Sequence, residues 1–530
     1  VVIDQRDGRD SYAYYGNTDW YNFLFDDSRP SQEHSINING GNNKVKYYLS
    51  GNIFEKKGIF SINPDEYKSV NFRSRLTAEL RPWLQISNNT KYFRSDYTFP
   101  GYGSVNNIFN TMSVHGLASY VPVHPDGTPV YQTSITDNGV MDGWSALLIH
   151  NKHNNRDQSF EFATTFEAVL KLLPDFDIRA NYSYIHFNSQ TMNRRMNFPY
   201  SKYPGEVAYF VSGIGQDRLY EKQTNHWYHA GNIYGNYQKT FEELHNVKLT
   251  VGANYETKYL KDLAMTRQDL LTTELNDFDL AVGEVMSITG GQNEYKILGT
   301  FYRANYDYDG KYLFEVSGRL DGSSRFMSGH RFGFFPSGSI GWRLSEENFF
   351  EQIKPVIPNL KIRASYGSLG NQQVGYYDYI QTISTGGAIN YSFGDGQKAS
   401  SASVSSPNAS DLTWEVVATK NFGIDMSLFD GKLDFTGDIY TRSTTGMLTA
   451  GKDLPSVYGA AIPKINSADL RTDGWEVTLA WRDKFTLKSK PFNYTARFIL
   501  SDYISTITKF DNPSKMLNNY YEGQRLGEIW

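Results

Sequence analysis

Apolar and polar residues alternate along most of the chain with a period of two, the pattern of a β-strand whose two faces meet different surroundings. Near the middle of the chain, Tyr312, Phe314 and Val316 alternate with mostly polar neighbours. The same pattern recurs at residues 421–428 and 471–483. Almost no window shows a helical period. The sequence therefore predicts an all-β chain.

About sixteen strands can be placed along the sequence from this alternation. They are expected at residues 34–40, 45–55, 70–81, 85–97, 159–170, 176–188, 226–240, 247–259, 295–308, 311–320, 331–344, 359–368, 413–428, 432–446, 471–483 and 493–507. We expect each boundary to be accurate to about two to four residues.

Short and long connections alternate along this strand order. The short ones carry hairpin signals, because Gly adopts a positive φ readily: Gly40-Gly41-Asn42-Asn43, Asp309-Gly310 and Asp430-Gly431, with further short joins at Arg81-Pro82-Trp83 and Leu173-Pro174-Asp175. The long ones are residues 98–158, 189–225, 260–294, 369–412 and 447–470. Strands that run up and down through a slab place alternate connections on opposite sides, so one side is trimmed while the other carries large loops.

This asymmetry favours a transmembrane antiparallel β-barrel, because a strand can cross hydrocarbon only in a closed barrel, with short turns on the periplasmic side. Tyr302, Tyr306, Tyr308 and Tyr312 surround the Asp309-Gly310 turn, where an interfacial aromatic belt would lie. The alternative is a large soluble β protein, such as a β-helix or propeller, in which these tyrosines simply pack.

Composition excludes several classes of protein. The 530 residues are 15% aromatic but only 39% hydrophobic, and no run approaches the roughly 18 apolar residues of a membrane-spanning helix. A net charge of -5 offers no basic surface for nucleic acid. The absence of Cys removes disulfides, cysteine nucleophiles and thiolate metal sites. The chain opens on Val1-Val2-Ile3 without a Met or a targeting segment, so we expect it to be a fragment.

Candidate catalytic and metal-binding patterns are weak. His150 with His153 and His226 with His229 are spaced by three residues, which on a strand sends the two side chains to opposite faces. The carboxylate pairs Glu242-Glu243 and Glu346-Glu347 lie in turn-like segments, where solvation is the simpler interpretation. Neither a His-Glu-x-x-His motif nor a phosphate-binding loop occurs. We therefore expect no enzyme, no metal and no cofactor.

An ordered set of segments resembles the SusC-type TonB-dependent outer-membrane transporters and covers essentially the whole chain. The matching segments are Thr18-Asp19-Trp20-Tyr21, Ile38-Asn39-Gly40-Gly41, Tyr47-Tyr48-Leu49-Ser50, Gly58-Ile59, Tyr312-Leu313-Phe314, Arg319 to Phe326, Phe335-Pro336-Ser337, Gly341-Trp342-Arg343, Leu360 to Gly367, Gly370-Asn371, Leu412-Thr413-Trp414-Glu415, Asn421-Phe422-Gly423, Asp473-Gly474-Trp475-Glu476 and Gly523-Gln524-Arg525-Leu526-Gly527.

The resemblance implies a 22-stranded barrel filled by an N-terminal plug domain that carries the TonB-contacting segment. Neither the plug nor that segment is found in this sequence, so residues 1–530 are interpreted as one barrel domain that is incomplete at one or both ends. The family imports oligosaccharides or peptides in the bacterial outer membrane, with a SusD-like lipoprotein and energy supplied through TonB. The resemblance also leaves open a dimer of transporter and lipoprotein pairs.

Three functions follow as hypotheses. The first is the import of oligosaccharides derived from glycan breakdown, with peptides as the alternative cargo within the same family. The second is a siderophore receptor with the same barrel. The third is an outer-membrane enzyme or adhesin, which predicts a compact catalytic constellation that the sequence does not show.

Candidate ligand contacts lie on the long loops and at one strand end. Arg319, Asp321 and Arg325 would face the lumen or a substrate, although an ion pair that orders the loop beside Gly322-Ser323-Ser324 is the simpler interpretation. Aromatic and acidic residues of the large loops suit sugar rings, a lipoprotein interface or plain packing. Those chosen as candidate substrate contacts are Trp144, Tyr203, Tyr391 and Asp395.

Overall fold

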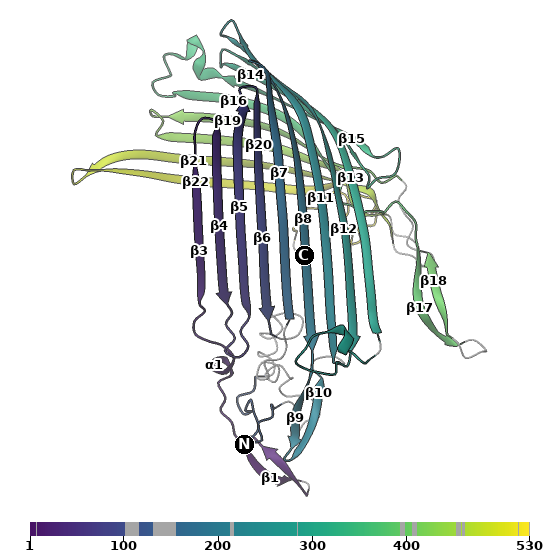
Figure 1. Ribbon diagram of the computed structural model, residues 1–530. Helices are drawn as coiled ribbons and strands as arrows, with labels where there is room; N and C mark the ends of the chain where they lie inside the picture. Colours follow the sequence, from purple (N-terminus) through teal and green to yellow (C-terminus); the bar gives the residue numbers. More distant parts are fainter. Residues whose placement is uncertain are drawn as a thin grey trace.

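One antiparallel sheet of sixteen strands dominates the computed structural model of the chain (Figure 1). The structure describes all residues except 7, 101–115, 131–154, 212–216, 284, 393–397, 405–410, 452–456, 458–461, 518 and 529–530. The strands of the sheet are β3 (Ser31–Gly41), β4 (Val45–Lys57), β5 (Glu66–Arg81), β6 (Leu84–Phe99), β7 (Asn155–Leu173), β8 (Phe176–Arg195), β11 (Arg218–Phe241), β12 (His245–Gln268), β13 (Val285–Tyr308), β14 (Tyr312–Ser323), β15 (Phe332–Arg343), β16 (Asn359–Asn371), β19 (Glu415–Leu428), β20 (Leu433–Ala450), β21 (Lys464–Leu487) and β22 (Lys490–Lys509).

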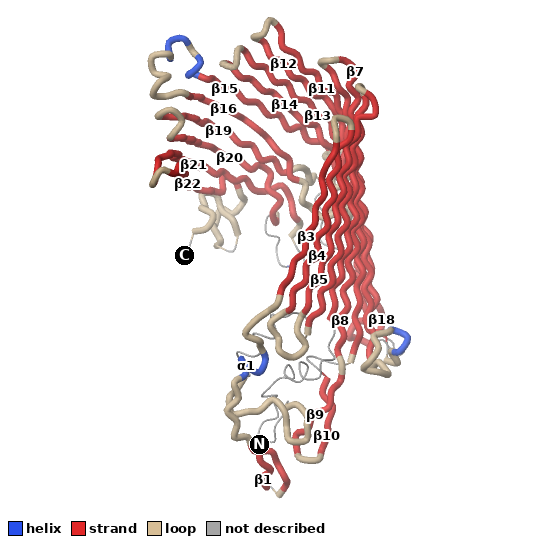
Figure 2. Tube along the Cα trace, turned by 60° about the vertical axis from the view of Figure 1, so that its left-hand side comes forward, coloured by secondary structure: helices blue, strands red, loops and turns tan. Residues whose placement is uncertain are grey.

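The strands of this sheet follow one another in chain order, from β3 at one edge to β22 at the other, and each pairs with its neighbours in that order. Figures 1 and 2 show that the sheet bends, so that β14 to β22 run at a steep angle to β3 to β13. Within the described residues the wall stays open between β3 and β22. The predicted all-β chain with sixteen strands in up-and-down order is confirmed.

The strand register gathers the alternating residues into one apolar and one polar face. Tyr306, Phe314 and Ile340 lie opposite one another on β13, β14 and β15, and the same line continues through Ala364, Phe422, Ile439 and Trp475. These apolar side chains are well exposed, with Ile340 at 56% and Ile439 at 60%. Such continuous exposure of large apolar groups fits contact with lipid and not with water.

Tight turns join the strands as the sequence predicts. Asp309 and Gly310 have φ values of 51° and 65°, and the Lys311 amide donates to the Tyr308 carbonyl at 2.9 Å. Asp430 and Gly431 also have positive φ, at 60° and 81°. Gly tolerates this backbone region because it has no Cβ. The hairpin signals are therefore confirmed.

The connections alternate in length around the sheet. Short joins lie at residues 42–44, 82–83, 174–175, 242–244, 309–311, 429–432 and 488–489, and the intervening joins are longer, up to residues 100–154 and 372–414. One join on the short side is an exception, because residues 344–358 include two 3₁₀ turns, η2 (Leu344–Glu346) and η3 (Asn348–Phe350). The predicted asymmetry between the two ends of the sheet is confirmed.

Several strands extend further than predicted at the long-connection end. Each of β11, β12, β13 and β21 contains 24 residues. The predicted strands stop up to ten residues short of the long-connection end. A crossing needs only about 9–11 residues, so these strands project beyond the hydrocarbon. Both faces are wet there, and the apolar alternation disappears in segments such as Glu221-Lys222-Gln223. The expected boundary accuracy was wrong at these ends.

Aromatic side chains form two bands on the apolar face. At the short-turn end Tyr308, Tyr312 and Trp342 stack in a row with centroid separations of 6.2 and 6.3 Å. At the other end His186 stacks on Trp227 at 5.4 Å, and Trp227 contacts Tyr259 at 5.5 Å. On β12 the bands lie 14 residues apart, from His245 opposite Tyr308 to Tyr259, and a tilted strand of that length rises about 35 Å, enough to cross the apolar band of a membrane barrel and reach both interfaces.

Three small hairpins and one helix lie outside the large sheet and were not predicted. They are β1 (Val2–Arg6) with β2 (Arg9–Ala13), β9 (Asn197–Tyr203) with β10 (Glu206–Val211), β17 (Ile383–Ser392) with β18 (Lys398–Val404), and α1 (Trp20–Leu24). Figure 1 shows β1, β9, β10 and α1 together below the long-connection end of the sheet. None of the helices in the described part of the chain has the length and hydropathy that a membrane crossing requires.

Candidate functional site

The predicted pair Arg319 and Asp321 meets on the polar face of β14. The Arg319 guanidinium donates to both carboxylate oxygens of Asp321, at 2.8 and 3.1 Å, and to the side-chain oxygen of Asn254 on β12 at 2.7 Å. It also lies 5.3 Å from the Phe301 ring centroid on β13. A spacing of two residues places both charges on one face of a strand. The ion pair therefore braces the strand wall and does not order the following loop.

Arg325 lies apart from that pair, in the connection after β14. Its guanidinium contacts two neighbouring tyrosine rings, 4.7 Å from the centroid of Tyr295 and 4.6 Å from that of Tyr376. One Nη atom donates to the Val374 carbonyl at 2.6 Å. Two cation–π contacts and a charged hydrogen bond fix this side chain. Arg325 thus helps to join the two loops after β14 and β16.

A buried apolar cluster supports this junction. Phe326, Phe335, Val374, Leu412 and Trp414 are each at most 8% exposed and pack together. The Trp414 indole donates to a backbone carbonyl of the loop after β14 at 2.8 Å. Since a buried indole N–H needs such a partner, the cluster has one well-defined packing. Residues 324–331 and 372–414 therefore meet at a fixed junction in their described parts.

A second charged centre on the polar face was not predicted. Arg363 on β16 donates to Asp438 on β20 at 2.6 and 2.7 Å and to Asp425 on β19 at 3.1 Å. It borders a hollow of about 720 Å³ that is lined by further polar residues, including Arg303 and Glu315. The sequence does place Arg363 on the polar face, within the Leu360 to Gly367 segment. Its carboxylate partners could not be identified from that segment, because they lie on other strands.

The remaining predicted contacts lie elsewhere or outside the described residues. Tyr203 ends β9, and the Arg9 guanidinium covers its ring at 3.5 Å from the centroid, so one face of that ring is already occupied. Tyr391 belongs to β17, and its side chain is not described. Trp144 and Asp395 lie outside the described residues. Among the four candidates whose side chains the structure describes, only Arg319 and Asp321 are in direct contact.

The weaker histidine pairs are only partly described. His226 packs on Phe187 at 5.3 Å, whereas His229 hydrogen-bonds Tyr182 on the other face of β11 at 2.7 Å. His150 and His153 lie outside the described residues. In the residues that the structure covers, no group of three or more acidic or histidine side chains is arranged to hold a metal ion.

The carboxylate pairs differ from one another. Glu242 and Glu243 form an exposed turn, as expected. Glu347 instead accepts hydrogen bonds from the Tyr312 hydroxyl at 2.7 Å and the Trp342 indole at 2.9 Å. These two hydrogen bonds lower the pKa of Glu347, against a small opposing effect of burial. Glu347 thus anchors the aromatic band, a role that its interpretation as a solvated carboxylate did not include.

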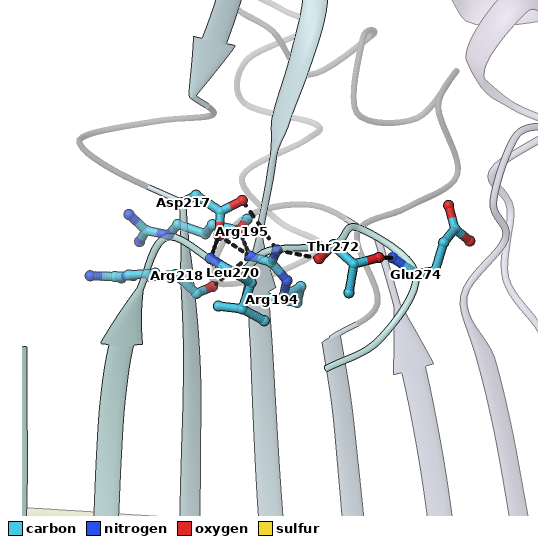
Figure 3. Close-up of polar contacts among 7 residues, drawn as sticks. All are labelled: Arg194, Arg195, Asp217, Arg218, Leu270, Thr272 and Glu274. Carbon is cyan, nitrogen blue, oxygen red and sulfur yellow. Dashed lines mark hydrogen bonds and ion pairs between the residues drawn. The ribbon is translucent and has the colours of Figure 1, made fainter. Parts of the chain in front are cut away.

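A buried ion pair ties two connections to the end of β8 at the long-connection end (Figure 3). Arg194, at the end of β8, is fully buried, and its Nη atoms donate to both carboxylate oxygens of Asp217 at 2.6 and 3.1 Å. The Asp217 carboxylate also accepts from the Leu270 amide at 3.3 Å, and Arg194 reaches the Thr272 carbonyl at 3.5 Å. A bidentate charged pair gives this junction a single geometry.

A polar cluster joins the small hairpins to residues 116–130. Buried His124 stacks on Tyr12 of β2 at 4.2 Å. The carboxylate of Asp126 accepts from the Tyr12 hydroxyl at 3.0 Å, from Thr128 at 2.6 Å and from Ser201 of β9 at 2.5 Å. Sequence reasoning missed the cluster, although His124-Pro125-Asp126-Gly127-Thr128 is a recognisable turn signal.

The environment of this cluster shifts two pKa values. Burial lowers the pKa of His124 to about 4, although the nearby Asp126 charge acts in the opposite direction. Burial alone would raise the pKa of Asp126, but hydrogen bonds from Ser201, Thr128 and Tyr12 bring it to about 2. The histidine is therefore neutral and the carboxylate ionised at neutral pH. A serine bonded to the carboxylate, and not to the histidine, is a structural bridge instead of a nucleophile.

The chain matches the family described as TonB dependent receptor-like, beta-barrel over residues 115–529. It belongs to the TonB-dependent receptor family. Proteins of this family lie in the bacterial outer membrane and are not enzymes, so the apolar face of the sheet is its lipid-facing side and the polar face lines the lumen. The resemblance to the SusC type is confirmed.

Two curated relatives illustrate the match. A TonB-dependent receptor of Formosa agariphila is 26% identical over 491 residues, which cover 92% of this chain and 46% of the relative. The TonB-dependent receptor SusC of Bacteroides thetaiotaomicron is 24% identical over 466 residues, which cover 82% of this chain and 43% of SusC. The chain thus spans about half the length of the curated relatives that it matches.

Solved structures show the same fold. The chain superposes on a structure of the RagAB peptide transporter with a TM-score of 0.76 and 21% identity, over 94% of this chain and 53% of that one. The outer membrane transporter YddB from Escherichia coli gives a TM-score of 0.55 at 10% identity, over 91% of this chain and 55% of that one. At these identities the likeness concerns the fold alone.

Proposed function

We propose that the chain is the barrel wall of an outer-membrane transporter that imports oligosaccharides actively. Membership of the TonB-dependent receptor family carries this proposal. The lumen-facing wall supports it, because side chains such as Arg319, Asp321, Asn254 and Arg363 offer charged and amide groups that remain partly exposed. A polar oligomer could exchange hydrogen bonds with such a wall in place of those to water.

A SusD-like lipoprotein is the proposed partner and TonB the proposed source of energy. The partner would dock at the long-connection end, whose loops carry the small hairpins, the His124 cluster and the junction at Arg325. Fixed loop junctions suit a surface that must bind another protein repeatedly, because little ordering entropy is then lost on association. The TonB contact and a plug domain belong to the same proposal, as does the domain assignment of residues 1–530 to one incomplete barrel.

Peptides are the second candidate cargo, because the fold superposes on a structure whose title describes a peptide transporter. Uptake measurements would separate the two. A strain lacking the gene, complemented with the wild type, would be supplied with labelled oligosaccharides, peptides of equal size or ferric siderophores. Oligosaccharide uptake that is abolished by a proton uncoupler is the expected result. Uptake of peptides or siderophores alone would overturn the cargo assignment, and uncoupler-insensitive uptake would overturn the role of TonB.

Copurification tests the partner separately. Extraction of the full-length protein from outer membranes in mild detergent should bring down a lipoprotein at a one-to-one ratio. A transporter that purifies alone, yet still imports its cargo, would contradict the proposed pairing while leaving the transport function intact.

A further inference from the structure

The lipid-facing side of the sheet carries a groove along one row of paired residues. Leu249, Ala304, Val316, Gly338 and Tyr366 are successive cross-strand partners from β12 to β16. Two small residues, Ala304 and Gly338, lower the surface within this row, whereas the adjacent row rises with Tyr306, Phe314 and Ile340. The result is a hollow of about 890 Å³ with a predominantly apolar lining, which we call the outer-face groove.

Lys420 lies at the β19 end of the outer-face groove. It pairs with Tyr366 across β16 and β19 and lines both this groove and a second hollow of about 520 Å³ beside Phe422, Ile439 and Trp475. Its side chain is exposed, and no hydrogen bond or ion pair links it to any residue that the structure describes. The groove therefore ends in an uncompensated positive charge.

The neighbouring carboxylate does not neutralise Lys420. Asp473 lies two strands away in the same row, next to Thr441. It accepts hydrogen bonds from the Thr441 hydroxyl at 2.6 Å and from Arg471 at 3.0 Å. Arg471 thus balances the charge of Asp473. The local excess at the end of the groove is one positive charge, contributed by Lys420.

The position of Lys420 places that charge at the outer boundary of the hydrocarbon. On β19 the lipid-facing residues Met426, Ile424 and Phe422 precede it, counted from the short turn at residues 429–432. Eight residues of tilted strand rise about 20 Å across the membrane, which places the backbone of Lys420 in the outer part of the roughly 25 Å apolar band, and its long flexible side chain carries the ammonium from there to the boundary. The long-connection end is the extracellular one, so Lys420 meets the headgroups of the outer leaflet.

We propose that the outer-face groove binds a lipid A molecule of the outer leaflet, with a phosphate on the Lys420 ammonium and an acyl chain along the row to Leu249. Charge complementarity selects this occupant, because a phosphate satisfies a lysine at the membrane boundary and the floor at Ala304 and Gly338 admits hydrocarbon. The site depends on the outer-membrane location and not on the cargo or energy source proposed above. It would hold one lipid at a fixed place on the barrel.

Two variants test the two halves of the site. Lys420→Met removes the charge but keeps the length of the side chain. Gly338→Leu fills the floor, and the backbone can accept it, because a Cβ at Gly338 would meet its nearest atoms at 3.5 and 3.8 Å. Matched controls are Lys296→Met, which removes a lipid-side lysine already paired with Glu294 at 3.2 Å, and Gly231→Leu on β11, where the nearest atom lies 3.9 Å away.

The experiment measures lipid retained by the full-length protein, purified from outer membranes and exchanged into nanodiscs, by native mass spectrometry. The probes are monophosphoryl lipid A, the same lipid without phosphate, and phosphatidylglycerol. We expect Lys420→Met to weaken monophosphoryl lipid A binding about fivefold without affecting the dephosphorylated lipid, and Gly338→Leu to weaken both. Controls should match the wild type.

Three results would overturn this assignment. One is equal lipid retention by the wild type, Lys420→Met and Gly338→Leu. Another is a preference for phosphatidylglycerol over lipid A that Lys420→Met abolishes, which would make the occupant a phospholipid. The third is a dimer that Gly338→Leu dissociates while lipid retention stays unchanged, which would assign the groove to a second copy of the chain.

Discussion

Arg194 and Asp217 form a bidentate ion pair that is almost completely withdrawn from solvent, with side-chain exposures of 0% and 5%. The pair joins the end of β8 to the start of β11, and through the Leu270 amide and the Thr272 carbonyl it also holds the connection between β12 and β13. A buried charge pair contributes little net stability, but it allows only one arrangement of the segments that supply it. The extracellular ends of three long strands therefore depend on one contact.

Arg194→Met should loosen this end of the barrel without unfolding the membrane-spanning part. The substitution leaves the Asp217 carboxylate buried without a cation, which costs about 3–5 kcal/mol locally. Hydrogen exchange of residues 269–283 should accelerate, while exchange in the central part of β12 stays slow. The double variant Arg194→Met with Asp217→Leu should recover most of the loss, because no buried charge remains.

The matched control for this prediction is Lys239→Met, which breaks an ion pair with Asp175 whose two side chains are 44% and 41% exposed. An exposed pair contributes about 0–1 kcal/mol, so exchange there should hardly change. If Lys239→Met and Arg194→Met accelerated exchange equally, burial of the Arg194 pair would have no special role.

The His124 cluster should make the extracellular module sensitive to acid. The pKa of His124 falls from 6.5 to about 4 in the folded protein, so the unfolded segment binds a proton more readily. Stability is therefore complete above about pH 6.5 and declines to a floor near pH 4, by about 3 kcal/mol in total. Asp126, whose pKa is lowered from 3.8 to about 2, adds a loss of the same sign only below about pH 5, where the unfolded carboxylate begins to bind protons.

Limited proteolysis of residues 116–130 between pH 7.5 and 4.5 measures this effect. His124→Phe keeps the ring that stacks on Tyr12 but cannot bind a proton, so its cleavage rate should be independent of pH over that range. Acid sensitivity that persists in His124→Phe would assign the effect to another group.

The large sheet was predictable because one physical requirement acts on every strand. Within the bilayer one face meets lipid and the other meets the lumen, so the alternation at Phe314 or Phe422 reports both the strand and its orientation. Outside the bilayer both faces of β11 or β12 are wet, so the pattern that would have marked their true ends is missing. The hairpins β9–β10 and β17–β18 lie wholly in that region and left no periodic signal.

The candidate site was predictable only where the contact is local in sequence. Arg319 and Asp321 are two residues apart on one strand, so their meeting follows from strand geometry. Arg194 and Asp217 pair across a connection, and Arg363 finds its carboxylates on two other strands. Such contacts depend on the register between strands, which the alternation of one strand cannot specify.

Arg319→Gln tests whether the wall at β14 contacts the imported molecule. The guanidinium is still 43% exposed despite its bonds to Asp321 and Asn254, so it has donors to offer to a ligand. Loss of a hydrogen bond to a charged group costs about 1.5–3 kcal/mol, which is a roughly tenfold or greater rise in the half-saturation concentration for uptake. Arg179→Gln, whose pair with Asp177 borders a different lumen hollow, should leave uptake unchanged. The same loss in both variants would indicate a general effect on the barrel.

Arg325→Lys should release the loop junction while keeping its charge. Lysine cannot stack on the rings of Tyr295 and Tyr376 as a planar guanidinium does, and it presents no rigid fork toward the Val374 carbonyl. We expect a local loss of about 1–2 kcal/mol, from the cation–π contacts and the hydrogen bond together. Hydrogen exchange of residues 372–382 should then quicken about tenfold, and affinity for a copurified lipoprotein should fall if this junction forms part of its docking surface. Unchanged exchange would mean that the apolar cluster around Trp414 holds the two loops together without Arg325.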